Sequence, residues 1–373
     1  MDVKKQTAAG WLMLLCVLVP WSPLDAQTDA PTPAPTSETK PAGQELSPTR
    51  LVLPTANDNL YRGNGEKYYM YVHRNFEGTD SRAWTAGKYG FVRNMRRTED
   101  GVIGTRFHEG IDVKPLKRDS SNNPLDEILA ISGGIVVYVN FSSAKSNYGK
   151  YVVVEHLWKT GSMFSLYAHL SKVHVKAGQQ IKQGEVIGIM GYTGRGINRE
   201  RSHLHLELNV LLSTKFSAWH EKHFGTQNIH GIHNGINLAG LDVSKLYLAQ
   251  LRNKNLTVPQ FLRSVPAHYK VTIPRAGKLD LVERNPWLAR GDHSKPSPSW
   301  EVSFTASGFP LSVVPSSRAV TAPRVSSIRK CKSKHEYHTK GFVSGTGYRA
   351  SLSKLGVRYL ELISEVTDSN TTP

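Results

Sequence analysis

The chain contains the run Ser202-His203-Leu204-His205-Leu206-Glu207, in which polar and apolar side chains alternate. In an extended strand, side chains two residues apart point to the same face. His203 and His205 therefore face one groove, where one histidine can bind a metal ion while the other acts on the attacking water. Glu207 shares that face. It either orients one of the histidines or makes an ordinary structural hydrogen bond.

Two further motifs supply the rest of a metal site. His108-Glu109-Gly110-Ile111-Asp112 lies upstream, and Tyr167-Ala168-His169-Leu170 lies between it and the first run. A hydrolytic zinc site needs three protein ligands from His and Asp or Glu, together with an open position for water. Residues of the right type in this order predict such a site.

The order H-x-G-x-D, Y-A-H-L and H-L-H-x-E resembles the lysostaphin-like zinc endopeptidases, which cut the peptide stems or bridges of bacterial peptidoglycan. The similarity also includes residues 148–156, the glycine-punctuated residues 175–188 and residues 193–195. It extends over residues 90–212 and leaves most of the chain without a recognised relative.

The resemblance implies a division of roles among five residues. His108, Asp112 and His205 are expected to bind one Zn²⁺ per chain, and His169 and His203 to form the catalytic pair that does not bind the metal. Peptide hydrolysis would then use metal-activated water, with one histidine as the base and the other stabilising the oxyanion or protonating the leaving amine. We expect His203 to be the main base and His169 its partner; the reverse assignment stays open.

Residues 196–202 depart from the family, whose loop is shorter and glycine-rich there, whereas this one is charged. Either Arg199 or Arg201 binds a carboxylate of a stem peptide, or the loop narrows the groove. His220, His223, His230 and His233 lie outside the family motifs and are not expected to be ligands.

Short β-branched runs separated by glycines predict a mainly β fold, an antiparallel barrel-like or sandwich sheet of the lysostaphin-like peptidase type. A short helical segment is expected over 213–263, where apolar residues recur three and four apart in 241–251. Strand-like runs then return in a small second β-rich domain. The expected strands are residues 128–131, 135–140, 151–156, 164–169, 186–190, 203–210, 269–273, 300–305, 311–314 and 358–363.

The chain divides by composition into five segments. Residues 1–26 have the positive start and apolar run of a secretory signal peptide, and residues 27–56 form a disordered linker rich in Pro and Thr. Residues 57–97 are expected to form a strand over 68–72 and loops near the groove. Residues 98–252 form the zinc peptidase domain, and residues 260–373 form a C-terminal β-rich domain of unknown role.

The formal net charge of +17 and the isoelectric point near 9.7 predict attraction to polyanions. We expect an exported protein of the periplasm, the cell wall or the extracellular space, with no stable transmembrane anchor after signal cleavage. Its expected partners are peptidoglycan stem or cross-bridge peptides and anionic envelope polymers. Nucleic acid is not expected, because no stacking or groove-reading motif accompanies the charge.

Two other functions fit the same features. One is a non-catalytic, zinc-binding wall adaptor or amidase regulator, which would bind zinc without turnover. The other is a zinc peptidase that cuts proteins. Cys331 is the only cysteine that remains after removal of residues 1–26, so no intrachain disulfide is expected.

Overall fold

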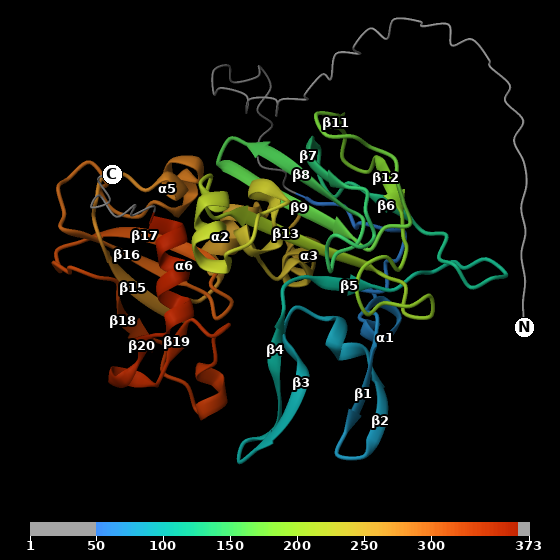
Figure 1. Cartoon of the computed structure of the whole chain (residues 1–373), viewed down its shortest axis with the longest axis horizontal. Helices are drawn as coiled ribbons and strands as arrows, with labels where there is room; N and C mark the ends of the chain where they lie inside the picture. Colours follow the sequence, from blue (N-terminus) through green and yellow to red (C-terminus); the bar gives the residue numbers. More distant parts are fainter. Residues whose placement is uncertain (1–49, 365–373) are drawn as a thin grey trace, which may run out of the picture. The chain divides into compact units, whose positions relative to one another are not determined.

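The centre of the structure is a seven-stranded antiparallel sheet (Figure 1). The computed structural model describes residues 50–364, so the predicted signal peptide and linker residues 27–49 lie outside the described part. Hydrogen-bonded neighbours follow the order β11-β7-β8-β9-β13-β14, and β5 also pairs with β13. The strands are β5 (Ile111–Val113), β7 (Gly134–Asn140), β8 (Tyr151–Trp158), β9 (Gly161–Ala168), β11 (Gln180–Ile181), β13 (Leu204–Leu211) and β14 (Leu238–Gly240).

Strand β13 shows how the alternating sequence builds the site. All of its residues are buried. Its odd-numbered residues from His205 to Asn209 are polar and point to the face opposite the main core. The even-numbered residues join that core; they are Leu204, Leu206, Leu208 and Val210. Packing of the apolar face into the core therefore keeps the polar face of β13 inside the protein. The prediction of a mainly β, antiparallel fold is confirmed.

A second, three-stranded sheet packs beside the first. It has the order β10-β12-β6, all antiparallel. Its members are β10 (Lys172–Val173), β12 (Val186–Ile189) and β6 (Glu127–Leu129). The six runs expected as strands between residues 128 and 210 all coincide with β6, β7, β8, β9, β12 and β13, with ends shifted by a few residues.

The beginning of the described chain packs onto this core, which corrects the predicted linker. Leu51 is 1% exposed, and its amide donates to Gln250 Oε1 at 3.0 Å. The Val52 amide donates to the Ile131 carbonyl at 3.1 Å. Buried apolar side chains and paired backbone groups belong to folded structure, so residues 50–56 are not part of a linker.

Two hairpins replace the loops expected over residues 57–97. The strand expected over 68–72 is wrong, because α1 (Gly65–Tyr68) ends there and β1 begins only at Val72. Asn64 caps the helix by accepting from the Lys67 amide, and residues 68–71 are all buried instead of alternating. The hairpins are β1 (Val72–Phe76) with β2 (Thr79–Ala83), and β3 (Gly90–Thr98) with β4 (Gly101–His108), joined by η1 (Trp84–Gly87).

The region expected to be helical is confirmed over much of 213–263. Asp242 starts α3 by accepting from the Lys245 amide, and Thr257 and Gln260 form a capping box on α4. The elements are α2 (Phe216–Phe224), η2 (Gly231–His233), η3 (Gly235–Asn237), α3 (Val243–Arg252) and α4 (Val258–Ser264).

A four-stranded antiparallel sheet of order β17-β16-β15-β18 follows. Its strands are β15 (Tyr269–Pro274), β16 (Ser299–Phe304), β17 (Pro310–Ser316) and β18 (Arg324–Ile328). The smaller elements are α5 (Asp280–Arg284), η4 (Pro286–Leu288), η5 (Lys334–Tyr337), β19 (Val343–Ser344), η6 (Gly347–Arg349) and β20 (Ser351–Leu352). All described residues fall in one unit by their contacts, so the boundary between 98–252 and 260–373 stays a prediction.

The strand expected over 358–363 is wrong, because α6 (Lys354–Ser364) occupies this segment. Gly356, Tyr359, Leu360 and Ile363 are its buried residues at helical spacing, which a strand would place on both faces. Among residues 50–364, no helix combines the length and apolar character needed to cross a membrane.

Candidate metal centre

Strand pairing brings the predicted ligands together. His108 is the last residue of β4, and Asp112 lies in the middle of β5. In the antiparallel register, Asp112 lies directly opposite His205 of β13. Facing residues in such a pair project to the same side of the sheet, so the carboxylate and the imidazole meet.

The three side chains present converging donor atoms. His205 Nδ1 lies 3.0 Å from Asp112 Oδ1, and His108 Nε2 lies 3.1 Å from each of these two atoms. Ligands of a tetrahedral zinc ion, at ~2.0–2.1 Å from the metal, are about 3.3 Å apart. All three residues are buried, and they are the only group of this kind among the described residues. The triangle therefore fits a zinc ion with little adjustment.

Outer hydrogen bonds fix which nitrogen of each ligand faces the cluster. His108 Nδ1–H donates to the Lys88 carbonyl at 2.8 Å, which leaves Nε2 for the metal. His205 Nε2–H donates to Glu207 Oε1 at 2.7 Å, which leaves Nδ1. Of the two alternatives for Glu207, the structure favours the orienting one: it is 1% exposed and binds His205 directly.

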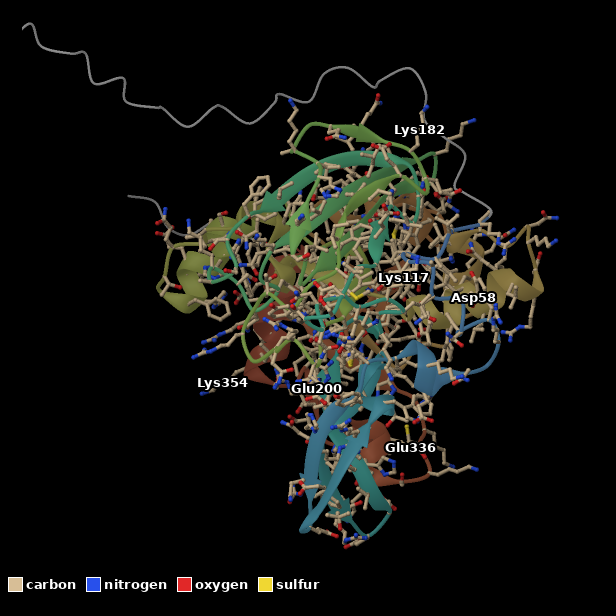
Figure 2. The ribbon with its side chains drawn as sticks, turned by 90° about the vertical axis from the view of Figure 1, so that its right-hand side faces the viewer. Asp58, Lys117, Lys182, Glu200, Glu336 and Lys354 are labelled. Carbon is tan, nitrogen blue, oxygen red and sulfur yellow. The ribbon has the colours of Figure 1, made fainter. Side chains whose placement is uncertain are left out.

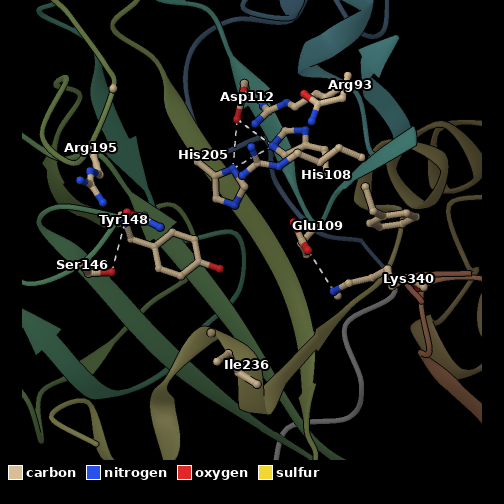
Figure 3. A pocket seen from close by; sticks show the side chains of 18 of the residues that line it. Arg93, His108, Glu109, Asp112, Ser146, Tyr148, Arg195, His205, Ile236 and Lys340 are labelled. Atoms are coloured by element: carbon tan, nitrogen blue, oxygen red, sulfur yellow. Dashed lines mark hydrogen bonds and ion pairs between the residues drawn. The ribbon is translucent and has the colours of Figure 1, made fainter. Parts of the chain in front are cut away.

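Asp112 is held by an arginine that the sequence did not indicate. Arg93, from β3, donates to Asp112 Oδ2 at 2.5 Å, while Oδ1 faces the two histidines (Figure 3). Burial opposes ionisation, but His108, His203 and Arg93 together hold the pKa of Asp112 well below its usual value. The carboxylate is thus charged and directed, as a metal ligand must be.

His205 carries a proton when no cation is bound. Burial disfavours its charged form, yet hydrogen bonds to Asp112 and Glu207 raise its pKa to about 9. The proton lies on the Nδ1 side that faces Asp112 Oδ1. A cation bound to the cluster takes the place of this proton, because a ligand nitrogen must be unprotonated.

His169 and His203 lie beside the cluster as a second pair. Their ring centroids are 4.8 Å apart, and His203 Nε2 lies 3.5 Å from Asp112 Oδ1. His169 Nδ1–H donates to the Thr193 carbonyl at 2.8 Å, and His203 Nδ1–H donates to the Arg201 carbonyl at 2.6 Å. Both rings therefore offer an unprotonated Nε2 when neutral.

Burial keeps this pair neutral. It lowers the pKa of His203 to about 4 and the pKa of His169 well below its ordinary value, where the neighbouring histidines add to the effect. Near pH 7 both side chains are therefore unprotonated at Nε2. All five residues that the sequence indicated are together in one site, and their catalytic and ligand roles remain predictions.

The centre opens into a cavity of about 1160 Å³. Its walls come from the two N-terminal hairpins, the loop at 195–201 and the C-terminal part of the chain. Lys340 pairs with Glu109 at 2.9 Å on one side, and Tyr148 and Arg195 lie on the other (Figure 3). Arg201 lines the cavity, whereas Arg199 does not.

The four histidines that were not expected to be ligands lie outside the cluster and have other contacts, although His230 lines the same cavity. His220 Nδ1 donates to the Thr226 carbonyl at 3.1 Å, and His223 bonds Glu361 at 2.8 Å. His230 lies between Tyr138 and the Lys145 carbonyl, and burial lowers the pKa of His233 to about 4. None of them belongs to a group of metal-ligand geometry within residues 50–364.

A His–Asp–His cluster next to two neutral histidines, open to a large cavity, is an arrangement typical of metal-dependent hydrolases. Residues 106–216 match the model of Peptidase family M23, and this part of the chain is a lysostaphin-like M23 peptidase domain.

Individual proteins are also similar to parts of this chain. An uncharacterized metalloprotease of Haemophilus influenzae is 31% identical over 162 residues, which are 39% of this chain and 30% of that protein. The peptidoglycan DD-endopeptidase ShyA of Vibrio cholerae is 44% identical over 62 residues, which are 17% of this chain and 13% of that protein. The catalytic domain of lysostaphin from Staphylococcus simulans is 26% identical, with a TM-score of 0.23, over 32% of this chain and 75% of that one. The chain spans less than a third of the length of these curated relatives.

Proposed function

We propose that this protein is an exported zinc endopeptidase that hydrolyses peptide crosslinks or bridges of peptidoglycan. The observation that carries the proposal is the triangle of His108 Nε2, Asp112 Oδ1 and His205 Nδ1, with edges of 3.0–3.1 Å, beside two histidines kept neutral by burial. The family match of residues 106–216 supports peptide hydrolysis. The substrate class is supported by the ShyA relative, which is named a peptidoglycan endopeptidase.

His108, Asp112 and His205 would hold the zinc ion. When bound, such an ion activates water near neutral pH and polarises the carbonyl that is attacked. Asp112 contributes charge, and the two imidazoles are held by Lys88 and Glu207 in the tautomers that a cation requires. The chain thus supplies three ligands and leaves the cavity side for water and substrate.

His203 is the better placed of the two bases, because its Nε2 is close to the ligand triangle, 3.5 Å from Asp112 Oδ1. It accepts a proton at Nε2 from the attacking water. As an imidazolium with both nitrogens protonated, it then donates that proton to the leaving amine.

His169 offers the same unprotonated Nε2, since its Nδ1–H is bound to Thr193. To stabilise an oxyanion it must therefore first carry a proton of its own, and its ring centroid lies 4.8 Å from that of His203, so the two charges would be coupled. We accordingly assign the two histidines as a coupled pair in which His203 acts first.

Export to the periplasm, cell wall or extracellular space is part of the proposal, as is contact with anionic envelope polymers. The net charge of +17 supports the second point. The first point is supported by two relatives, a cell division protein of Caulobacter vibrioides, 30% identical over 146 residues, and a lipoprotein homolog of Pseudomonas aeruginosa, 38% identical over 81 residues.

Release of soluble muropeptides from purified sacculi tests the proposal. The full chain is incubated with sacculi with and without a chelator, and in parallel as His203→Ala. Chelator-sensitive release with new free amines, lost in the variant, is the expected result, and mass spectra then identify the bond. About one bound zinc per chain without any release would instead favour a wall adaptor, and cleavage confined to proteins would favour a protein-directed peptidase.

A further inference from the structure

We propose that Arg201 forms a carboxylate-binding subsite beside the metal centre, so that the enzyme selects peptides carrying a free carboxylate next to the cleaved bond. This inference rests on the proposed function and names its substrate class. It concerns the charged loop at residues 196–202.

Arg201 is tied to the catalytic pair by its own backbone. Its carbonyl accepts the Nδ1–H of His203 at 2.6 Å, and its side chain lines the same cavity as His203 and Asp112. The guanidinium Nε donates to the Tyr71 carbonyl at 3.2 Å, which sets the direction of the side chain. A cation at this position lies next to whatever peptide His203 acts on.

Among the described residues, the Arg201 guanidinium forms no ion pair. Within residues 50–364, no carboxylate oxygen lies within the 4.0 Å ion-pair distance of its guanidinium. Its neighbour Asp112 is already bound by Arg93 at Oδ2 and faces the histidines at Oδ1. Arg201 is only partly exposed. A partly desolvated charge is costly when unpaired, so an anion that enters the cavity gains a strong partner.

The loop is fixed before any substrate arrives. Arg118, in the insertion after β5, donates to the carbonyls of Arg199 and Glu200 and to Ser202 Oγ, at 2.9–3.0 Å. Glu200 accepts from the Tyr71 hydroxyl at 2.7 Å and pairs with Arg82 at 3.1 Å.

Figure 2 shows Glu200 where the loop meets the base of the N-terminal hairpins. Two segments outside the metal site, the 117–123 insertion and the β1–β2 hairpin, therefore hold the loop in place. A preorganised guanidinium loses little entropy on binding.

The rest of the cavity wall is positively charged overall, as Arg201 is. Its arginines outnumber its acids, of which Glu109 pairs with Lys340 and Asp112 belongs to the metal cluster. The arginines that line it, besides Arg201, are Arg74, Arg93, Arg106 and Arg195. The field in the cavity therefore favours an acidic substrate over a neutral one.

Arg199 provides a matched control on the same loop. Its guanidinium donates to the Ser121 carbonyl at 3.0 Å and lies 5.9 Å from the ring centroid of Tyr192, away from the cavity. The contacts of residue 199 with Arg118 and Ser202 use its backbone carbonyl, which Arg199→Gln leaves in place.

The test compares two forms of one substrate. Crosslinked muropeptide dimers from sacculi are used directly or after their free carboxylates have been converted to amides. The full chain is assayed as wild type, Arg201→Gln, Arg201→Lys and Arg199→Gln. Because hydrogen bonds between charged groups are stronger than neutral ones, we expect the wild type to prefer the acidic dimers by roughly 10- to 100-fold in kcat/KM.

Arg201→Gln should lose this preference through a higher KM for the acidic dimers, whereas the KM for amidated dimers should not rise. Arg201→Lys should retain part of the preference, and Arg199→Gln all of it. Equal cleavage of both dimers by the wild type overturns the proposal. So does an Arg201→Gln variant that slows both dimers equally, because that outcome assigns Arg201 only to the position of His203.

A binding measurement separates this inference from the proposed function. Affinity for the same two dimers is measured in a His169→Asn background, which keeps all three ligands. Carboxylate-dependent binding that needs Arg201, without cleavage by the wild type, would retain the subsite and reject the endopeptidase. Cleavage without carboxylate dependence would do the reverse.

Discussion

Glu207 offers the sharpest test of how the metal centre is built. Its Oε1 accepts the Nε2–H of His205 at 2.7 Å and the hydroxyl of Tyr148 at 2.8 Å. Its Oε2 has no hydrogen-bond partner among the described residues. The carboxylate thus acts on the metal site through one short, buried, charge-assisted hydrogen bond that directs Nδ1 of His205 toward Asp112.

The expected loss of zinc affinity follows from the strength of the hydrogen bond between His205 and Glu207. A charge-assisted hydrogen bond contributes ~1.5–3 kcal/mol, about twice a neutral one, and loss of such an outer partner typically lowers metal affinity by roughly 10- to 100-fold. Glu207→Gln keeps an acceptor oxygen and loses the charge, so we expect about a 10-fold weaker zinc affinity. Glu207→Ala removes the acceptor and frees the His205 ring, so we expect about 100-fold.

Competition with a chromophoric chelator at fixed pH measures both affinities. Tyr148→Phe is the control, because it removes the other donor to Glu207 Oε1 and leaves the bond to His205 intact; its zinc affinity should stay within about threefold of wild type. If Glu207→Gln and Glu207→Ala both bind zinc as tightly as the wild type, Glu207 does not orient His205 and the reasoning fails.

Three further predictions address the site and the core around it. Gly110→Ala places a Cβ against the Leu206 carbonyl and 2.9 Å from His205 Cε1, so the variant should lose about 1–3 kcal/mol in urea unfolding and bind less than one zinc; wild-type values for both would contradict the packing. His169→Asn should keep one zinc per chain by metal analysis while kcat falls roughly 100- to 10,000-fold, and a normal kcat would remove His169 from the pair. Burial lowers the pKa of His156 to about 4, so the folded protein binds fewer protons than the unfolded chain between pH 6.5 and 4, and stability falls as pH drops through that window. This contributes roughly 3 kcal/mol, which His156→Asn should abolish from the pH dependence of unfolding; an unchanged pH slope would refute it.

The sequence predicted the secondary structure correctly where polar and apolar residues recur with one clear period. The alternation of β13 indicated a strand with a polar and an apolar face, and the structure places those faces as expected. The segment from 354 to 364 misled because its Val, Tyr and Ile residues favour strands, whereas its buried positions follow a helical spacing. Residues 50–56 were taken for linker because their composition continues the Pro and Thr run; their order comes from tertiary partners such as Gln250.

The sequence predicted the five residues of the site, but not most of the residues that hold them in place by hydrogen bonds. The motifs indicated five side chains that the structure gathers in one place. Arg93 and Lys88 carry no local signal, since their contacts with the site span 19 and 20 residues of sequence. Tyr148 begins a stretch that resembles the family, but its contact with Glu207, 59 residues away, could not be read from it. The choice between Arg199 and Arg201 also needed the structure, because two arginines one residue apart on either side of Glu200 differ only in which way the loop turns them.

The hydrogen bonds that each ring makes on its outer side account for the proposed roles of His205 as ligand and His203 as base. His203 and His205 are two residues apart and face the same cavity. His205 gives Nε2–H to a carboxylate, which makes its inner nitrogen more basic and suits a cation. His203 gives Nδ1–H to a neutral carbonyl, and burial then keeps it uncharged and ready to accept a proton. That carbonyl belongs to Arg201, so the residue that orients the proposed base also carries the cation proposed to bind the substrate carboxylate. Orientation of His203 and recognition of the carboxylate would then depend on the same residue.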